Sequence, residues 1–243
     1  MDVPRACQAD EQRKTAGAMK KLDYEQLASL PLFLGIDGTT LSHIYEAINP
    51  VIAPMRKGGV IITAGEECRS LVFLLEGDIN ANSTFGKNRF TINETIRAVA
   101  VIEPQCLFGL HTTYTRNYTA ATGGYYLRLP KTVIVRQMME NDVFRFNFTN
   151  MLSSQAQETL RRLRRMPSGT IESRMTEFFA RQTLRPTGRK QIKCKMTDLA
   201  ECLCETRLNV SRTLHDLEGR GLLKFTRGII EIPAMEKLPA AAK

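Results

Sequence analysis

The sequence predicts an α+β chain in which a roll of short strands is followed by a long helix and then by three helices and a hairpin. Three observations carry this prediction: β-rich runs punctuated by glycine between residues 51 and 129, a helical apolar stripe from 142 to 166, and a basic region after residue 160. With 243 residues, 43% of them hydrophobic, the chain is long enough for two modest domains with separate cores.

The amino end is polar. Residues 1–21 contain no apolar run, so we expect a flexible tail rather than a secretion signal. Two short helices are predicted next, Asp23–Leu30 and Asp37–Ile48, the second capped by Asp37. No stretch approaches the roughly 20 apolar residues of a membrane-spanning helix. We therefore expect a cytoplasmic protein without a membrane partner.

Five β-rich runs follow, and glycine turns such as Gly58-Gly59 and Gly123-Gly124 separate them. Regular short strands with turn signals predict a sandwich or a barrel-like roll, which we place at residues 22–131. The five runs are Val60–Thr63, Leu71–Leu75, Phe90–Ile92, Ala98–Ile102 and Tyr125–Leu129.

A long helix is expected in residues 132–166. Between Asp142 and Met166, apolar residues step by three and four along one stripe, which Pro167 ends. Such a stripe packs either on the chain's own roll or on a second copy, and the unit that follows favours the second copy. The residues expected in this dimer contact are Phe148, Leu152, Ala156, Leu160 and Leu163.

Residues 167–243 predict a helix, a second helix, a turn, a third helix and a hairpin. Thr197 is expected to cap the second helix and Thr206 the third. The hairpin combines Leu222–Thr226 with Ile229–Ile232.

The excess of positive over negative charge lies entirely in the last third of the chain. Residues 1–160 hold 16 Lys and Arg against 16 Asp and Glu, whereas residues 161–243 hold 18 against 9, which accounts for the net charge of +9. A neutral first part and a basic last part of the chain predict a polyanionic partner, and nucleic acid is favoured over anionic membrane.

The third helix of this unit has the pattern of a DNA-reading helix. At 100° per residue Val210, Leu214 and Leu217 form its buried side, so Leu208 and Arg212 point outwards. Arg can fork onto guanine, Asn can pair with adenine, and hydroxyls reach phosphates. The expected DNA contacts are Thr197, Thr206, Arg207, Leu208, Asn209, Ser211, Arg212, Lys224 and Arg227.

Catalytic and metal-binding motifs are missing from the sequence. It has no C-x-x-C, and the closest cysteines, Cys194, Cys202 and Cys204, are more typical of buried or reduced thiols than of a metal site. It also has no G-x-S-x-G, P-loop or H-E-x-x-H. We expect neither an enzyme nor a bound cofactor.

Motifs in both halves of the chain occur in an order and spacing that are specific. They are Gly59-Val60-Ile61-Ile62, Ala64-Gly65-Glu66, the run Leu71 to Ile79, Phe108-Gly109, Met196 to Leu203, Asn209 to Leu214, Leu217-Glu218 through Gly221-Leu222-Leu223, and Arg227-Gly228. With them the chain resembles, over residues 22–238, the cyclic-AMP receptor protein/FNR (CRP/FNR) family of bacterial transcription regulators.

This resemblance implies an amino-terminal double-stranded β-roll of the cyclic-nucleotide-binding type, jelly-roll-like in form, then a long dimerisation helix and a winged helix-turn-helix. It further implies a homodimer that binds specific sequences of double-stranded DNA and regulates transcription, with RNA polymerase as a partner. An unidentified small-molecule effector stays open. The alternative is a small-molecule-binding module whose basic tail docks onto protein or membrane.

The chain departs from the family at the effector site. Leu110 stands where cyclic-nucleotide-binding members carry Glu for the ribose, and Tyr118 stands where they carry Arg for the phosphate. Without these charge-assisted bonds we expect that cyclic AMP is not the effector. The candidate effector pocket comprises Gly109, Leu110, His111, Tyr118 and Thr119.

Two further departures lie in the helix-turn-helix. Cys204-Glu205 replaces the family's usual glycine and aliphatic residue in the turn, so a positive φ at Cys204 would strain it. Leu208 replaces a Glu that reads cytosine in many members, so the target site cannot be copied from the family.

Overall fold

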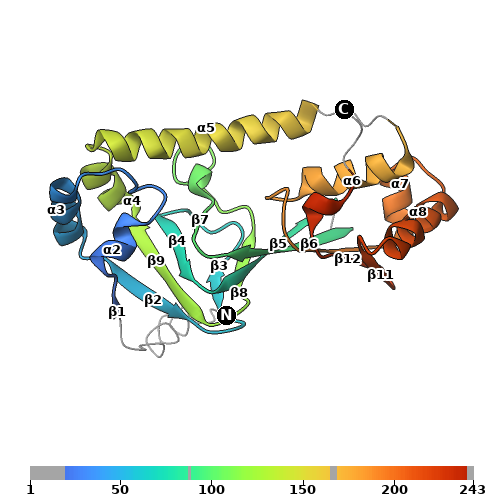
Figure 1. Cartoon of the computed structure of the whole chain (residues 1–243), viewed down its shortest axis with the longest axis horizontal. Coiled ribbons are helices and arrows are strands. Elements are labelled where there is room, and N and C mark those ends of the chain that lie inside the picture. Colours follow the sequence, from blue (N-terminus) through green and yellow to red (C-terminus); the bar gives the residue numbers. More distant parts are fainter. Residues whose placement is uncertain (1–19, 87–88, 165–168, 240–243) are drawn as a thin grey trace, which may run out of the picture.

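The structure, a computed structural model, describes residues 20–86, 89–164 and 169–239. A roll and a carboxyl-terminal helical unit lie at opposite ends of an elongated molecule, and a long helix runs beside the roll towards that unit (Figure 1). None of the described helices is both long and apolar enough to cross a membrane.

The predicted α+β architecture is confirmed. In the roll the elements are β1 (Lys20–Lys21), α2 (Tyr24–Ala28), α3 (Gly38–Ile48), β2 (Val51–Met55), β3 (Val60–Ile62), β4 (Ser70–Glu76), β5 (Asp78–Phe85), β6 (Phe90–Arg97), β7 (Ala100–Ile102), the 3-10 turn Pro104–Cys106, β8 (Asn117–Ala120) and β9 (Gly124–Pro130). After the roll they are α4 (Lys131–Val133), the π-helical turn Ile134–Met138, α5 (Asp142–Arg164), α6 (Ile171–Gln182), β10 (Lys190–Cys194), α7 (Met196–Cys202), α8 (Arg207–Gly219), β11 (Lys224–Thr226), β12 (Ile229–Ile232) and the 3-10 turn Met235–Lys237.

Two sheets form the framework. One has the strand order β1-β2-β9-β4-β7, and the other has the order β11-β12-β10-β6-β5-β8-β3. The turn from β4 to β5 requires a glycine, because Gly77 has a φ of 86° and a Cβ there would collide with the carbonyl of Gly123.

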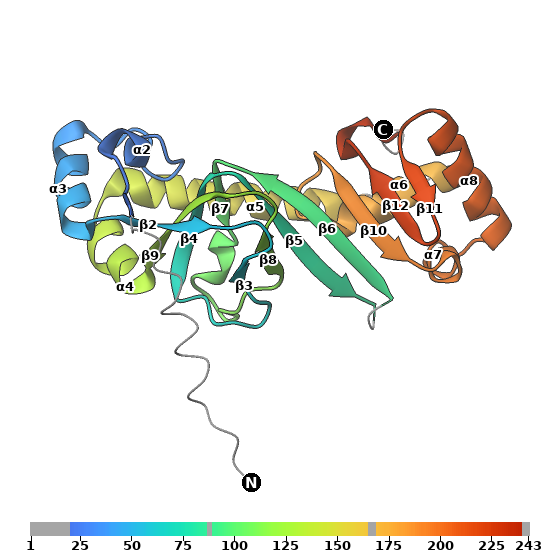
Figure 2. The same ribbon diagram turned by 90° about the horizontal axis from the view of Figure 1, so that it is seen from below.

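The second sheet joins the two halves of the chain. The β5–β6 hairpin extends out of the roll, and β6 pairs antiparallel with β10 of the carboxyl-terminal unit, Ile92 opposite Ile192 (Figure 2). Every second residue of β6 from Phe90 to Ile96 is buried, as expected for a strand with one face on a core. Phe90 and Ile92 belong to the core of the carboxyl-terminal unit, although the sequence assigned them to the roll.

The first half of α5 packs on the roll. The ring of Phe144 lies 5.5 Å from that of Phe33, and the ring of Phe148 lies 6.0 Å from that of Phe108, between centroids. The helix starts where the side chain of Asn141 accepts a hydrogen bond of 2.9 Å from the backbone N–H of Phe144. The segment expected as one helix is therefore two, since α4 and its π-helical turn end before α5 begins.

Other boundaries also differ from the prediction. The cap of α3 is confirmed, because Asp37 accepts from the N–H of Thr40 at 2.9 Å. Lys20 and Lys21, expected in the tail, form β1 and pair with β2. The rest of that tail, residues 1–19, lies outside the described residues, as does Met166. Strands β2, β5, β8 and β10 had no counterpart among the predicted runs.

Candidate nucleic-acid interface

Helix α8 is fixed by a cap at its start and by an apolar face along its length. The Thr206 hydroxyl accepts a hydrogen bond of 3.2 Å from the N–H of Asn209, so the predicted cap is confirmed. Val210, Leu214 and Leu217 are fully or almost fully buried. Because these three residues occupy one side, the other side of α8 is turned to solvent.

The outward side carries the residues expected to read bases. Arg207 and Arg212 are exposed and, among the described residues, make no ion pair. Leu208 is 59% exposed, so its apolar side chain is free to contact a partner on this side of the helix. Asn209 and Ser211 are half-buried, and the Asn209 amide donates to Glu205 at 3.1 Å.

The turn before α8 is held by charge. Cys204 has a φ of 51°, which confirms that a non-glycine residue adopts the left-handed conformation there. Arg174 of α6 pairs with Glu205 and donates to the carbonyl of Leu203 at 2.9 Å. Hydrogen bonds from Asn209 and then Arg174 lower the pKa of Glu205, so its carboxylate form is stabilised.

Helix α7 begins earlier than the sequence predicted. Lys195 occupies the cap position with extended backbone, and Thr197 is the second helical residue, so the prediction that Thr197 caps this helix is wrong. The backbone of Lys195 continues the extended conformation of β10, and the helix can start only after it. Thr197 is exposed, on the first turn of α7.

The hairpin of β11 and β12, called the wing below, lies beside the start of α7. The N–H of Cys194 donates to the carbonyl of Gly228 at 2.9 Å, which ties the hairpin tip to the end of β10. Lys224 and Arg227 are both exposed on this hairpin.

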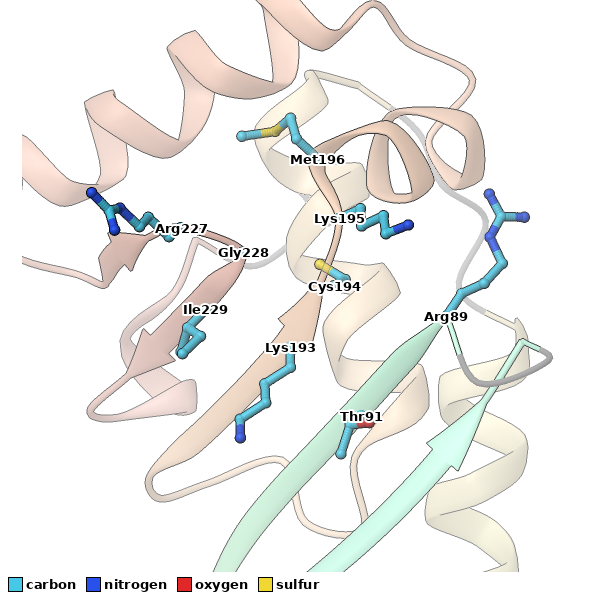
Figure 3. Close-up of a pocket in the computed structure, with 9 residues that line it drawn as sticks. All are labelled: Arg89, Thr91, Lys193, Cys194, Lys195, Met196, Arg227, Gly228 and Ile229. Atoms are coloured by element: carbon cyan, nitrogen blue, oxygen red, sulfur yellow. The ribbon is translucent and has the colours of Figure 1, made fainter.

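A basic groove opens between the wing, β10 and the tip of the β5–β6 hairpin (Figure 3). It has a volume of about 600 Å³. Its cationic side chains are Arg89, Lys193, Lys195 and Arg227, and within the described part of the chain only Arg89 among them has an ion-pair partner. Sequence reasoning missed the first three, although the alternation of Lys193 and Lys195 is the pattern of one strand face.

The candidate effector residues differ in their burial. Leu110 is 97% exposed and His111 and Gly109 are also exposed, whereas Tyr118 is buried inside the roll. Thr119 lies in β8, opposite Val60 and Asn80 in the neighbouring strands. None of these five residues lines the basic groove or a second cavity of about 430 Å³ beside Cys68.

The interior of the roll holds a buried carboxylate instead. Glu103 accepts hydrogen bonds of 2.8 Å from the Tyr118 hydroxyl and from both the N–H and the hydroxyl of Thr115. The thiol of Cys106 donates to it at 3.2 Å. Burial, and then this hydrogen bond, raise the pKa of Cys106 to about 12. Four hydrogen-bond donors thus satisfy the Glu103 carboxylate.

The residues expected in a dimer contact divide along α5. Phe148 is buried on the chain's own roll and Leu152 packs partly against it, so these two face inwards. Ala156 and Leu160 are exposed, as is Phe146 earlier on the same outer side. Leu163 lies in α5, but its side chain falls outside the described residues. Among the residues that are described, no group of three or more His, Cys, Asp or Glu is placed to hold a metal ion.

The helix-turn-helix and the overall fold both have known relatives. Residues 173–241 match the family described as the Crp-like helix-turn-helix domain. No curated protein matches the chain significantly. A solved structure assigned to transcriptional regulators of the CRP/FNR family, from Eubacterium rectale, is 16% identical with a TM-score of 0.51, over 86% of this chain and 96% of that chain. The chain therefore shares the fold of that protein.

Two other solved structures are similar over most of their length. The c-di-GMP responsive global regulator CLP of Xanthomonas campestris is 14% identical with a TM-score of 0.49, over 81% of this chain and 99% of its own. The catabolite activator protein of Thermus thermophilus is 16% identical with a TM-score of 0.46, over 83% and 93%.

Proposed function

Since the chain carries a Crp-like helix-turn-helix domain on a fold shared with a CRP/FNR-family regulator, we propose that it is a homodimeric, sequence-specific DNA-binding regulator of transcription. The observation that carries this proposal is the outer face of α8, where the guanidinium groups of Arg207 and Arg212 are exposed beside an exposed Leu208. A helix with exposed guanidinium groups towards its amino end fits the major groove, where Arg forks onto guanine.

The surface around α8 supports contacts with the DNA backbone. Thr197 and Thr206 offer hydroxyls at the starts of α7 and α8, and Lys224 and Arg227 lie on the wing. The basic groove beside the wing adds two more cationic side chains, Lys193 and Lys195. Such phosphate contacts set the position of the protein on the duplex, while α8 reads the bases.

The outer side of α5 supports the homodimer. Ala156 and Leu160 are exposed and lie four residues apart, and Phe146, nearer the start of α5, is exposed as well. Two copies joined through this side would present two recognition helices, which must bind half-sites about 34 Å apart. RNA polymerase remains among the proposed partners, because a regulator of this type acts beside it on the promoter.

The residues of the roll argue against cyclic AMP as the effector, so the effector is either another molecule or absent. Tyr118 fills the interior and bonds to Glu103, and Leu110 faces solvent, so neither offers the charge that a cyclic phosphodiester needs.

A gel shift with a labelled duplex, selected in vitro by the protein and competed with unrelated DNA, tests the proposed DNA-binding function. Retention of the selected duplex is expected. Equal competition by unrelated DNA would favour a basic unit that merely docks onto polyanions.

A further inference from the structure

The β5–β6 hairpin belongs to the roll by sequence, yet its tip touches the helix-turn-helix. Strand β10 pairs along its whole length with the first five residues of β6, from Glu94 opposite Lys190 to Phe90 opposite Cys194. This register places Arg89, the residue before β6, next to the start of α7 (Figure 3).

Arg89 makes two ion pairs with α7. Its Nη2 donates to Asp198 Oδ1 at 2.8 Å and also to Glu201, and its Nη1 lies 3.4 Å from Glu201 Oε1. Asp198 is mostly buried, with 15% of its side chain exposed, while Glu201 is 69% exposed. The hydrogen bond from Arg89 lowers the pKa of Glu201, so the carboxylate form of Glu201 is stabilised.

The position of these two carboxylates creates a problem for a DNA-binding surface. Asp198 directly follows Thr197, an expected phosphate contact, and α7 borders the groove lined by Lys193 and Lys195. Two uncompensated negative charges here would repel the phosphate backbone within the Debye length of about 10 Å. Among the described residues, the cation that pairs with Asp198 and Glu201 is Arg89. This residue comes from the β5–β6 hairpin and not from the helix-turn-helix.

We propose that Arg89 is a positioning residue for DNA binding: the roll supplies it to neutralise Asp198 and Glu201 and to hold α7 in place. The proposal rests on the proposed function and adds a specific consequence. The affinity for DNA depends on a residue outside the helix-turn-helix that lies at the basic groove but acts through the two carboxylates of α7. A movement of the hairpin would leave both carboxylates without this cation and weaken binding.

A double-mutant cycle tests this role. The affinity for a labelled duplex selected by the wild-type protein is measured by fluorescence anisotropy at low salt for Arg89→Ala, for Asp198→Asn/Glu201→Gln, and for all three changes together. Arg89→Ala is expected to weaken binding at least about tenfold, because two carboxylates then face the phosphates without a cation and like charges across an interface are unfavourable. In the background without the two carboxylates the same change should have less than about a twofold effect, because nothing remains to be neutralised.

Two variants serve as controls. Arg97→Ala removes an exposed charge at the other end of β6, and it should leave the affinity unchanged. Arg89→Lys keeps the charge and should recover part of the affinity, which a purely steric role would not allow. Thermal unfolding of each variant verifies that it is folded.

The possible results distinguish a failure of the role proposed for Arg89 from a failure of the proposed DNA-binding function. If Arg89→Ala weakens binding by the same factor in both backgrounds, Arg89 contacts DNA directly and the inference is overturned. Tighter binding by Arg89→Ala overturns it as well, because the contact would then be inhibitory. If the wild-type protein selects no duplex at all, the proposed function itself fails.

Discussion

Glu94 and Lys190, from opposite halves of the chain, form an ion pair of 2.9 Å in which each side chain is only 1% exposed. Glu94 also accepts from Arg116 at 2.9 Å and from the backbone N–H of Leu184 at 2.6 Å. Lys190 donates in addition to the carbonyl of Thr187. One carboxylate on the roll's hairpin thus binds groups from both sides of the junction between the two units.

Removing this carboxylate should destabilise the protein strongly. Glu94→Gln leaves the charges of Lys190 and Arg116 buried without their partner, and breaking such a pair typically costs about 3 to 5 kcal/mol. Chemical denaturation measures the free energy of unfolding. Glu67→Gln is the matched control, since its pair with Arg69 is exposed and should be worth less than about 1 kcal/mol. Equal destabilisation of the two variants would contradict a central role for Glu94.

The interior of the roll predicts that cyclic AMP does not bind. Tyr118 and Thr115 already saturate Glu103, and Leu110 lies outside, so a phosphodiester would find a buried negative charge instead of a guanidinium. Calorimetric titration of cyclic AMP into the protein should give no saturable heat. Micromolar affinity would show that this interior rearranges around a ligand.

Sequence periodicity predicted the elements whose pattern is local. The buried side of α8 and the cap at Thr206 follow from three apolar positions and one hydroxyl, and both are found in the structure. The start of α7 was misplaced because Thr197 is a good cap by residue type, whereas the extended backbone of Lys195 decides where the helix begins.

The junction between the two units could not be predicted from local patterns. Lys190 has the character of a surface cation in sequence, and only its distant partner Glu94 compensates for its burial. Arg89 likewise sits in an ordinary turn, and its role depends on β6 pairing with β10. The burial of the candidate effector residues was not predictable from local pattern either, since Leu110 faces solvent whereas Tyr118 is buried in the roll.

Dimerisation through α5 should be sensitive to charge on its exposed side. Ala156→Glu with Leu160→Glu would bring like charges together in the contact, and light scattering should then report a monomer. Ser154→Glu is the control, since Ser154 is exposed on another side of the same helix. An unchanged dimer in the double variant would place the interface elsewhere.

The basic groove should contribute to affinity but not to sequence preference. Lys193→Ala and Lys195→Ala are each expected to weaken binding to all duplexes alike, and to reduce the slope of log affinity against log salt by about one unit for each phosphate that the protein no longer neutralises. Lys57→Ala, on a turn of the roll, should leave the slope unchanged. If Lys57→Ala has the same effect, only net charge matters and the groove is not part of the interface.

The most direct test of sequence reading is in vitro selection from randomised duplexes with wild type, Arg212→Ala and Leu208→Ala. Arg212 should supply a bidentate contact to guanine, worth roughly 1 to 3 kcal/mol of discrimination, and Leu208 a contact to a thymine methyl. Each variant should therefore lose its preference at a different base pair of each half-site, while Lys193→Ala selects the wild-type sequence. If both α8 variants also select the wild-type sequence and only bind it more weakly, α8 does not read bases through these residues.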